Sequence, residues 1–215
     1  MTRSVFAPER VAVAEGATWL KAWLPLAEQQ AMVARCRALM DGPAGGYVPV
    51  VRGGGQMHVR MLCLGRHWNA LTYAYEAVRA DHDGQPVPPV PDDWVTLVSQ
   101  AAADAGFTFT PDVCIVNFYG ADGRMGLHQD KDESPASIAA GDPVVSISLG
   151  ETARFLFGGV RRRDPVAPLL LESGDVFVFG GASRLRYHGV TRILPGSAPP
   201  SLGIDGRFNL TFRRY

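Results

Sequence analysis

The amino-acid sequence predicts an α+β protein that is mainly β, in which two helices precede a β-sandwich or jelly roll. From residue 113 onward, short apolar segments alternate with turns that contain glycine. Strands repeated every 8–12 residues or so are typical of a sandwich or jelly roll, whereas parallel strands need crossovers of about a dozen residues or more. The expected strands are residues 113–118, 143–149, 153–157, 168–171, 175–179 and 207–213.

The two helices are predicted in the first half of the chain. Apolar residues recur at helical spacing over residues 27–39, with glutamines and arginines between them, and Asp41-Gly42-Pro43 follows as a stop signal. A second helix is expected over residues 94–105, with Asp92 or Asp93 as its cap. These helices should support one face of the β-rich half.

Two further strands and a long loop are expected between the helices. Residues 47–51 and 57–64 are strand-like, and the glycines at 53–55 separate them. This glycine run lacks the strand-to-helix context of a dinucleotide-binding turn, so we interpret it as a hairpin or loop. The polar and aromatic loop at residues 65–91 is long, and loops of this length are often lids or binding loops.

Composition limits the class of protein. The chain has 215 residues and no net charge, which argues against a broadly basic nucleic-acid binder and leaves room for a local patch. We expect one domain over residues 1–215, with the helices and a lid in 1–110 and the β core in 111–215. No window approaches the ~18 apolar residues of a membrane span, and the N-terminus lacks the apolar region of a signal peptide. We therefore expect a cytoplasmic monomer with reduced cysteines.

A candidate metal site begins at the end of the first β-core strand. His128 and Asp130 lie two positions apart, so on an extended segment their side chains point to the same face. His188 is the only histidine after them. Two histidines and one carboxylate form the facial triad of non-haem Fe(II) oxygenases, with three metal positions left open. A zinc hydrolase with the same three ligands remains an alternative at this point.

The last predicted strand suggests a co-substrate. In the segment RFNLTFR, Phe208, Leu210 and Phe212 share one face, while the polar residues share the other. Two arginines, Arg207 and Arg213, therefore face the same way. Arginine binds carboxylates through a planar fork, so a dicarboxylate with one end on the metal would satisfy both the metal and an arginine. A zinc hydrolase would leave both arginines without a role.

Together these motifs resemble the AlkB family of Fe(II)/2-oxoglutarate-dependent dioxygenases, which repair alkylated nucleic acid bases. The resemblance extends from about residue 53 to the C-terminus. Its most specific segments are LHQDKDE at 127–133 and RFNLTFR at 207–213, and it includes VSISLG, FLFGG, LLLESGD and GGASRLRYHG. It implies a double-stranded β-helix, a variant of the jelly roll, with an N-terminal nucleotide-recognition lid.

The resemblance also implies roles for individual residues in binding Fe(II), 2-oxoglutarate and O₂. The iron ligands would be His128, Asp130 and His188. Arg207 would bind the distal carboxylate of 2-oxoglutarate, and Arg213 would lie near its keto-acid end. Further hydrogen bonds to the co-substrate would come from Asn117, Tyr119 and Asn209. Phe179 stands where the family commonly has tryptophan, which we interpret as a tolerated core change.

Four residues are implied on the substrate side. Asp132 would accept a hydrogen bond from the exocyclic nitrogen of the damaged base, and Trp68 would sandwich the base with the His128 ring. Arg162 would reach toward the pocket. Tyr75 would contact the nucleic acid, with Tyr73 as the alternative lid tyrosine. Two charged residues next to the metal ligands, Lys131 and Glu133, are expected at the rim of the site. Three other histidines, His58, His67 and His82, are expected to be ordinary polar residues.

The expected activity is oxidative demethylation of bases such as 1-methyladenine and 3-methylcytosine. 2-Oxoglutarate would become succinate and CO₂, and the methyl group would leave as formaldehyde. The substrate would be single-stranded or flipped-base DNA, or RNA, because a stacked base cannot enter such a pocket. The alternatives are a 2-oxoglutarate-dependent hydroxylase of a protein or small molecule, and a non-enzymatic binding module with a structural metal.

Overall fold

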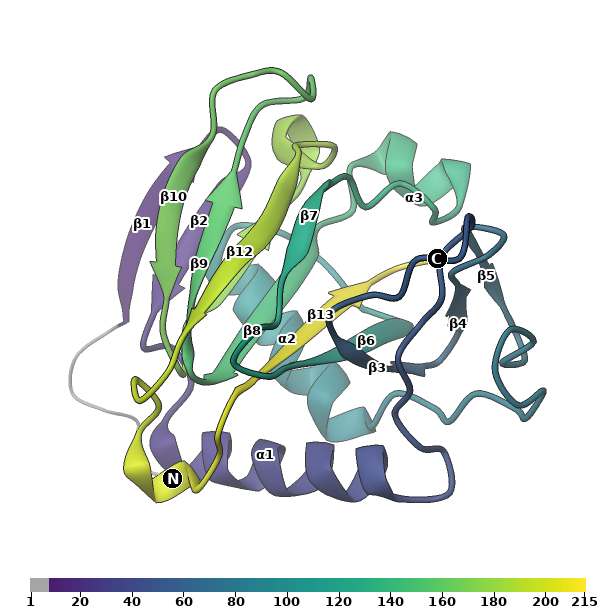
Figure 1. Cartoon of the computed structure of the whole chain (residues 1–215). Helices are drawn as coiled ribbons and strands as arrows, with labels where there is room; N and C mark the ends of the chain where they lie inside the picture. The colour runs from purple at the N-terminus through teal and green to yellow at the C-terminus, as the bar shows by residue number, and fades with distance from the viewer. Residues whose placement is uncertain (1–7) are drawn as a thin grey trace.

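The computed structural model describes residues 8–215, and its core is a sandwich of two antiparallel sheets (Figure 1). Every strand pairing in this range is antiparallel. The strands are β1 (Glu9–Ala14), β2 (Ala17–Lys21), β3 (Arg60–Leu64), β4 (His67–Asn69), β5 (Ala74–Glu76), β6 (Val113–Tyr119), β7 (Met125–His128), β8 (Val144–Gly150), β9 (Thr152–Phe157), β10 (Ala167–Leu171), β11 (Val176–Phe179), β12 (His188–Leu194) and β13 (Arg207–Arg213). The helices are α1 (Leu26–Asp41), α2 (Asp92–Asp104) and α3 (Pro135–Ala140), with 3₁₀ turns η1 (Gly181–Ser183) and η2 (Pro200–Leu202).

The two sheets differ in size. The major sheet has seven strands in the order β1-β2-β11-β8-β13-β6-β3, and the minor sheet has four in the order β10-β9-β12-β7. A separate hairpin, β4-β5, lies in the long loop at residues 65–91. This arrangement confirms the predicted jelly roll, in which strands distant in sequence become neighbours.

The helices cover the outer face of the major sheet. Met32 and Val33 of α1 and Trp94 and Val98 of α2 belong to one apolar cluster with Leu210 of β13. In Figure 1, α1 runs along the bottom of the view and α2 lies behind β13. The predicted supporting helices are therefore confirmed. The cap of α2 is different: its N-cap is Pro91, and Asp92 and Asp93 lie in the first turn, where carboxylates interact favourably with the helix dipole.

The space between the sheets holds a second core. Phe155 and Phe157 of the minor sheet pack with Phe177 and Phe179 of the major sheet. Phe179 is buried, as expected for a core residue. On β13, the apolar residues face the helices, and the polar residues from Arg207 to Arg213 face this inner space. The predicted alternation of the last strand is thus confirmed.

Several elements differ from the sequence-based expectation. The strands expected at 47–51 and 57–64 reduce to β3 and to isolated bridges that include Tyr47 and Val50. Strands β1, β2, β4, β5, β7 and β12 and helix α3 were not predicted. β2 joins the major sheet by pairing with β11, and the turn before β2 needs Gly16, where a Cβ would lie 2.3 Å from the Gly180 carbonyl oxygen. Within residues 8–215, no helix combines the length and apolar character that a membrane crossing requires.

Candidate active site

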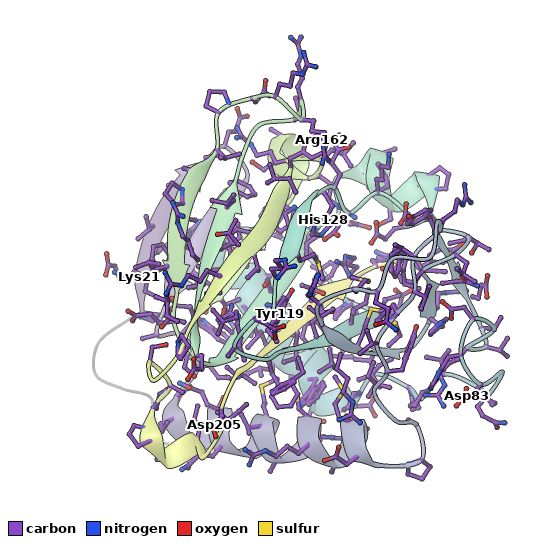
Figure 2. The ribbon with its side chains drawn as sticks, viewed as in Figure 1. Lys21, Asp83, Tyr119, His128, Arg162 and Asp205 are labelled. Atoms are coloured by element: carbon purple, nitrogen blue, oxygen red, sulfur yellow. The ribbon has the colours of Figure 1, made fainter. Side chains whose placement is uncertain are left out.

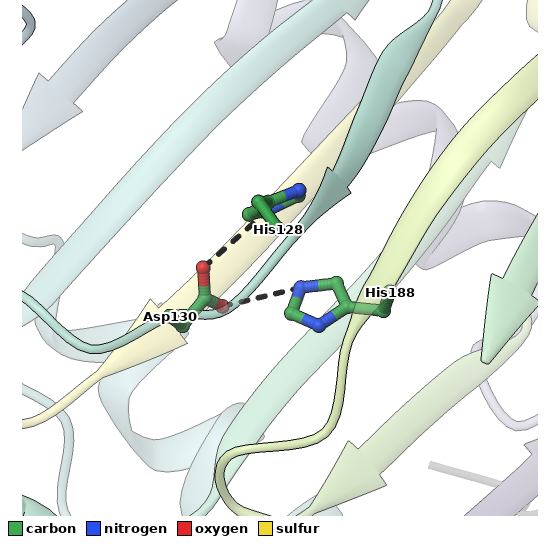
Figure 3. Close-up of side chains that lie close together, drawn as sticks. All are labelled: His128, Asp130 and His188. Atoms are coloured by element: carbon green, nitrogen blue, oxygen red, sulfur yellow. Dashed lines mark ion pairs between the residues drawn. The ribbon is translucent and has the colours of Figure 1, made fainter. Parts of the chain in front are cut away.

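The three predicted metal ligands lie together where strands β7 and β12 of the minor sheet pair. His128 ends β7 and His188 begins β12, and the two residues are direct partners in the ladder. Asp130 follows β7 by two residues. One Asp130 oxygen lies 3.6 Å from Nε2 of His128 and the other lies 3.5 Å from Nε2 of His188 (Figure 3). All three ligand atoms lie within 4.8 Å of one another, so a single ion can contact all of them.

Backbone carbonyls orient both imidazole rings. Nδ1 of His128 lies 2.9 Å from the Gly126 oxygen, and Nδ1 of His188 lies 3.0 Å from the Arg186 oxygen. If each Nδ1–H donates to its carbonyl, each Nε2 lone pair faces Asp130, as in metal-binding histidines. Desolvation inside the pocket and the neighbouring His188 lower the pKa of His128 to about 4. A neutral imidazole is the form that binds a metal.

Asp130 is a buried carboxylate that stays ionised. Burial alone would raise the pKa of its carboxyl, but the Arg213 guanidinium and the two histidines outweigh this effect and hold the pKa well below its usual value. Nη2 of Arg213 donates to Oδ2 of Asp130 at 2.7 Å. Two neutral imidazoles and one carboxylate are a donor set that suits Fe(II), so the residues present fit the implied metal.

A cavity between the sheets connects the triad to Arg207. It is lined by both histidines and by Asn117, Tyr119, Arg207, Asn209 and Arg213, the residues predicted to bind the co-substrate. Figure 2 shows Tyr119 below His128, between the two sheets. The side chain of Asn209 already donates to Ser146 and to the Ile147 carbonyl, whereas Oδ1 of Asn117 is buried and has no partner within residues 8–215.

Arg207 carries a buried charge that no carboxylate of residues 8–215 neutralises by direct contact. It is 1% exposed, and its Nη atoms donate to the carbonyls of Leu171 and Glu151 and to the hydroxyl of Ser148. Its Nε has no partner within the described chain. Burial lowers the pKa of Arg207 to about 10. A buried guanidinium with unused donors at the inner end of the cavity fits the distal carboxylate of 2-oxoglutarate.

Comparison with known proteins decides the family. The model of the 2OG-Fe(II) oxygenase superfamily matches residues 16–213. The chain belongs to this superfamily. It is 43% identical to the Alpha-ketoglutarate-dependent dioxygenase AlkB of Escherichia coli over 168 residues, which cover 77% of this chain and 75% of that protein. The predicted resemblance to AlkB, and with it Fe(II) and 2-oxoglutarate as cofactors, is confirmed.

Two further likenesses concern ALKBH1 proteins. The chain is 42% identical to the DNA N(6)-methyladenine demethylase ALKBH1C of Arabidopsis thaliana over 93% of its own length, and it spans about half the length of that relative, 48%. The structure reported as that of OsALKBH1 superposes with a TM-score of 0.91 at 38% identity, covering 96% of this chain and 100% of the other. The fold therefore has a solved counterpart.

A second, wider pocket opens outward from the triad of this oxygenase. Its volume is about 800 Å³, within the ordinary range for small-molecule sites. Its lining includes all four residues predicted on the substrate side: Trp68, Tyr75, Asp132 and Arg162. Indole Nε1–H of Trp68 donates to Oδ2 of Asp132 at 2.8 Å, so the two predicted base contacts hold each other in place. Arg162 donates to the Leu127 carbonyl at the upper rim, where Figure 2 shows it above His128.

The two tyrosines of the loop at residues 65–91 have different surroundings. Tyr75 is only 7% exposed, and its hydroxyl donates to Oε1 of Glu133 at 3.3 Å. Tyr73 is 42% exposed, its ring centroid lies 5.8 Å from that of Trp68, and the Arg52 guanidinium lies 5.5 Å from its ring centroid. Its φ of 56° is unusual for a bulky residue. Of these two tyrosines, Tyr73 is thus the exposed one.

Two expectations about neighbouring residues were wrong. Glu133 is not a rim residue: its side chain is 2% exposed and pairs with Arg184 and Arg213. His67 is not an ordinary polar residue, because it is fully buried against Asp81 in the lid, with the Tyr47 hydroxyl 3.2 Å from the same nitrogen. Lys131 is exposed, as expected. No local pattern marks Glu133 or His67, since their partners lie far along the chain or in an irregular loop.

Proposed function

We propose that this oxygenase removes N-methyl groups from nucleobases by oxidation, with 1-methyladenine and 3-methylcytosine as its substrate class. The observation that carries the proposal is the hydrogen-bonded pair of Trp68 and Asp132 on the wall of the outer pocket, beside His128. An aromatic ring and a carboxylate side by side suit a flat, cationic ring that carries an exocyclic N–H. The names of the ALKBH1 relatives, a DNA N(6)-methyladenine demethylase and a nucleic acid dioxygenase, support a nucleic-acid substrate.

Each group in the site has a separate task in this proposal. His128, Asp130 and His188 would hold Fe(II), and Arg207 would bind the distal carboxylate of 2-oxoglutarate. With O₂, the bound iron and 2-oxoglutarate supply the oxidation that converts N–CH₃ to N–CH₂OH, which releases formaldehyde, while 2-oxoglutarate leaves as succinate and CO₂. Tyr119, Asn209 and Asn117 would complete the co-substrate cavity, and the buried oxygen of Asn117 has no partner among residues 8–215.

The protein's residues would place the base rather than perform the oxidation. One oxygen of Asp132 is held by Trp68, and its other oxygen would accept the exocyclic N–H of the base. Trp68 and the His128 ring would enclose the base. We propose Tyr73, the exposed ring, as the lid residue that stacks on nucleic acid, and Arg162 as a contact at the rim. A base in a duplex must be flipped to enter, and methylation of its pairing edge lowers that cost.

The ALKBH1 relatives suggest a second substrate, N6-methyladenine in DNA. This base is neutral and carries its methyl group on the exocyclic nitrogen, so Asp132 would have one N–H to accept and no positive charge to offset. The cationic class gains more from the carboxylate. The same site could instead hydroxylate a protein or small molecule, in which case methylated oligonucleotides would remain unchanged.

Mass spectrometry of defined oligonucleotides tests the proposal. Single-stranded DNA and RNA with one 1-methyladenine, 3-methylcytosine or N6-methyladenine should be incubated with enzyme, Fe(II), 2-oxoglutarate and ascorbate. We expect loss of the methyl group from the first two bases, with formaldehyde and succinate in equal amounts. Formation of succinate without any demethylated base would contradict the proposal that methylated nucleobases are the substrate. We also propose that the chain acts as one domain, monomeric and cytoplasmic, which size-exclusion chromatography and cell fractionation would test.

A further inference from the structure

Glu133 lies at the centre of a buried ionic network behind the metal triad. Its carboxylate pairs with Nη2 of Arg184 at 2.8 Å and lies 3.1 Å from Nε of Arg213. It also accepts the hydroxyl of Tyr75 on lid strand β5. Burying a carboxylate is expensive unless charges and hydrogen bonds surround it. Three partners from three distant parts of the chain meet this requirement.

Arg213 lies between two carboxylates. Its Nη2 donates to Asp130 at 2.7 Å, and its Nε lies 3.1 Å from Oε1 of Glu133 in an ion pair that lacks the alignment of a hydrogen bond. The two arginines and two acids of the network carry equal and opposite charge, and Arg184 also donates to the backbone oxygen of Asp130. Without Glu133, Asp130 would be the only carboxylate of residues 8–215 in contact with Arg213. The guanidinium would then be free to rotate and form hydrogen bonds with both Asp130 oxygens, which are the atoms that face the histidines.

We propose that Glu133 is a positioning residue, whose ion pair with Arg213 keeps that guanidinium in place so that Asp130 keeps its oxygens toward the two histidines. Through the Tyr75 hydroxyl, the same carboxylate ties this arrangement to β5 of the lid. The lid and the metal site are thereby mechanically coupled. This inference rests on the proposed function for its role in turnover, but its test requires neither nucleic acid nor catalysis.

Titration of the purified protein with Mn(II) by calorimetry tests the positioning role. Glu133→Gln removes the charge, and we expect Mn(II) to bind about tenfold more weakly, because the ion pair that keeps Arg213 in place is lost. Glu133→Asp keeps the charge but is one methylene shorter, so it cannot reach Arg213 and Arg184 together. We expect it to bind Mn(II) more weakly than the wild type as well.

The two variants separate the effect of the position of the Glu133 carboxylate from the effect of its charge. Wild-type affinity in Glu133→Asp, with loss only in Glu133→Gln, would mean that net charge alone matters, and this would overturn the proposal. Glu28→Gln, on the exposed face of α1, is the matched control and should bind Mn(II) as the wild type does. Thermal melts establish that each protein is folded. If Glu133→Gln does not fold, the Mn(II) affinity of Glu133→Asp decides the outcome. Weaker binding than in the wild type supports the proposal, and wild-type affinity contradicts it.

Hydrogen exchange tests the link to the lid. In the wild type, Mn(II) with 2-oxoglutarate should slow amide exchange across β4 and β5. Tyr75→Phe keeps the ring but removes the hydroxyl that Glu133 accepts, so this slowing should be lost although Mn(II) still binds. Equal protection of the lid in both proteins would show that no coupling runs through this hydroxyl.

Discussion

Replacing Arg207 with lysine should weaken 2-oxoglutarate binding while preserving the charge. A guanidinium has five N–H donors. In Arg207, three protein acceptors occupy both donors on Nη1 and one of the two donors on Nη2. The remaining donors are on Nε and Nη2, and this pair of guanidinium nitrogens can bind a carboxylate through two parallel hydrogen bonds. An ammonium has only three donors, and the same three acceptors would occupy them.

The expected loss in 2-oxoglutarate affinity is about 1–3 kcal/mol, because charge-assisted hydrogen bonds are lost while the positive charge remains. This corresponds to a roughly 5- to 150-fold larger Kd. Calorimetric titration of 2-oxoglutarate into the Mn(II)-loaded protein measures it. Arg192→Lys, at an exposed position of β12, is the matched control and should leave the affinity unchanged. An unchanged Kd in Arg207→Lys would refute the assignment and mean that the distal carboxylate binds elsewhere.

Three further predictions concern the metal and the substrate. Alanine at any one triad position should abolish Mn(II) binding and Fe(II)-dependent succinate formation, and a variant that still forms succinate would remove that residue from the site. Asp132→Ala should slow demethylation roughly 10- to 100-fold, since a charge-assisted hydrogen bond contributes about 1.5–3 kcal/mol, while succinate formation without substrate continues; parallel loss of both would indicate a damaged metal site instead. Tyr73→Ala should weaken oligonucleotide binding by about 1–3 kcal/mol without changing the melting temperature, whereas Tyr75→Ala should cost about 3–5 kcal/mol of stability; reversed effects would assign the substrate contact to Tyr75.

Local periodicity in the sequence was enough to predict the centre of this site. Residues two apart on an extended segment share a face, which brought His128 and Asp130 together and placed Arg207 and Arg213 on one side of β13. The structure confirms both arrangements. The turns and apolar segments after residue 113 predicted the sandwich for the same reason, because strand alternation and turn chemistry are properties of a few neighbouring residues.

Only the tertiary structure reveals the strands and the buried polar side chains whose partners lie far away in the sequence. β1 and β2 were not predicted, and their place in the major sheet depends on β11, the distant strand with which β2 pairs. Glu133 looks like a surface residue beside other charges, but partners at positions 75, 184 and 213 make its burial possible. The lid tyrosines are alike in sequence, and the packing alone turns Tyr75 inward and leaves Tyr73 open. Burial of a polar side chain depends on which distant groups surround it, and that information lies in the assembled sheets rather than in any local pattern.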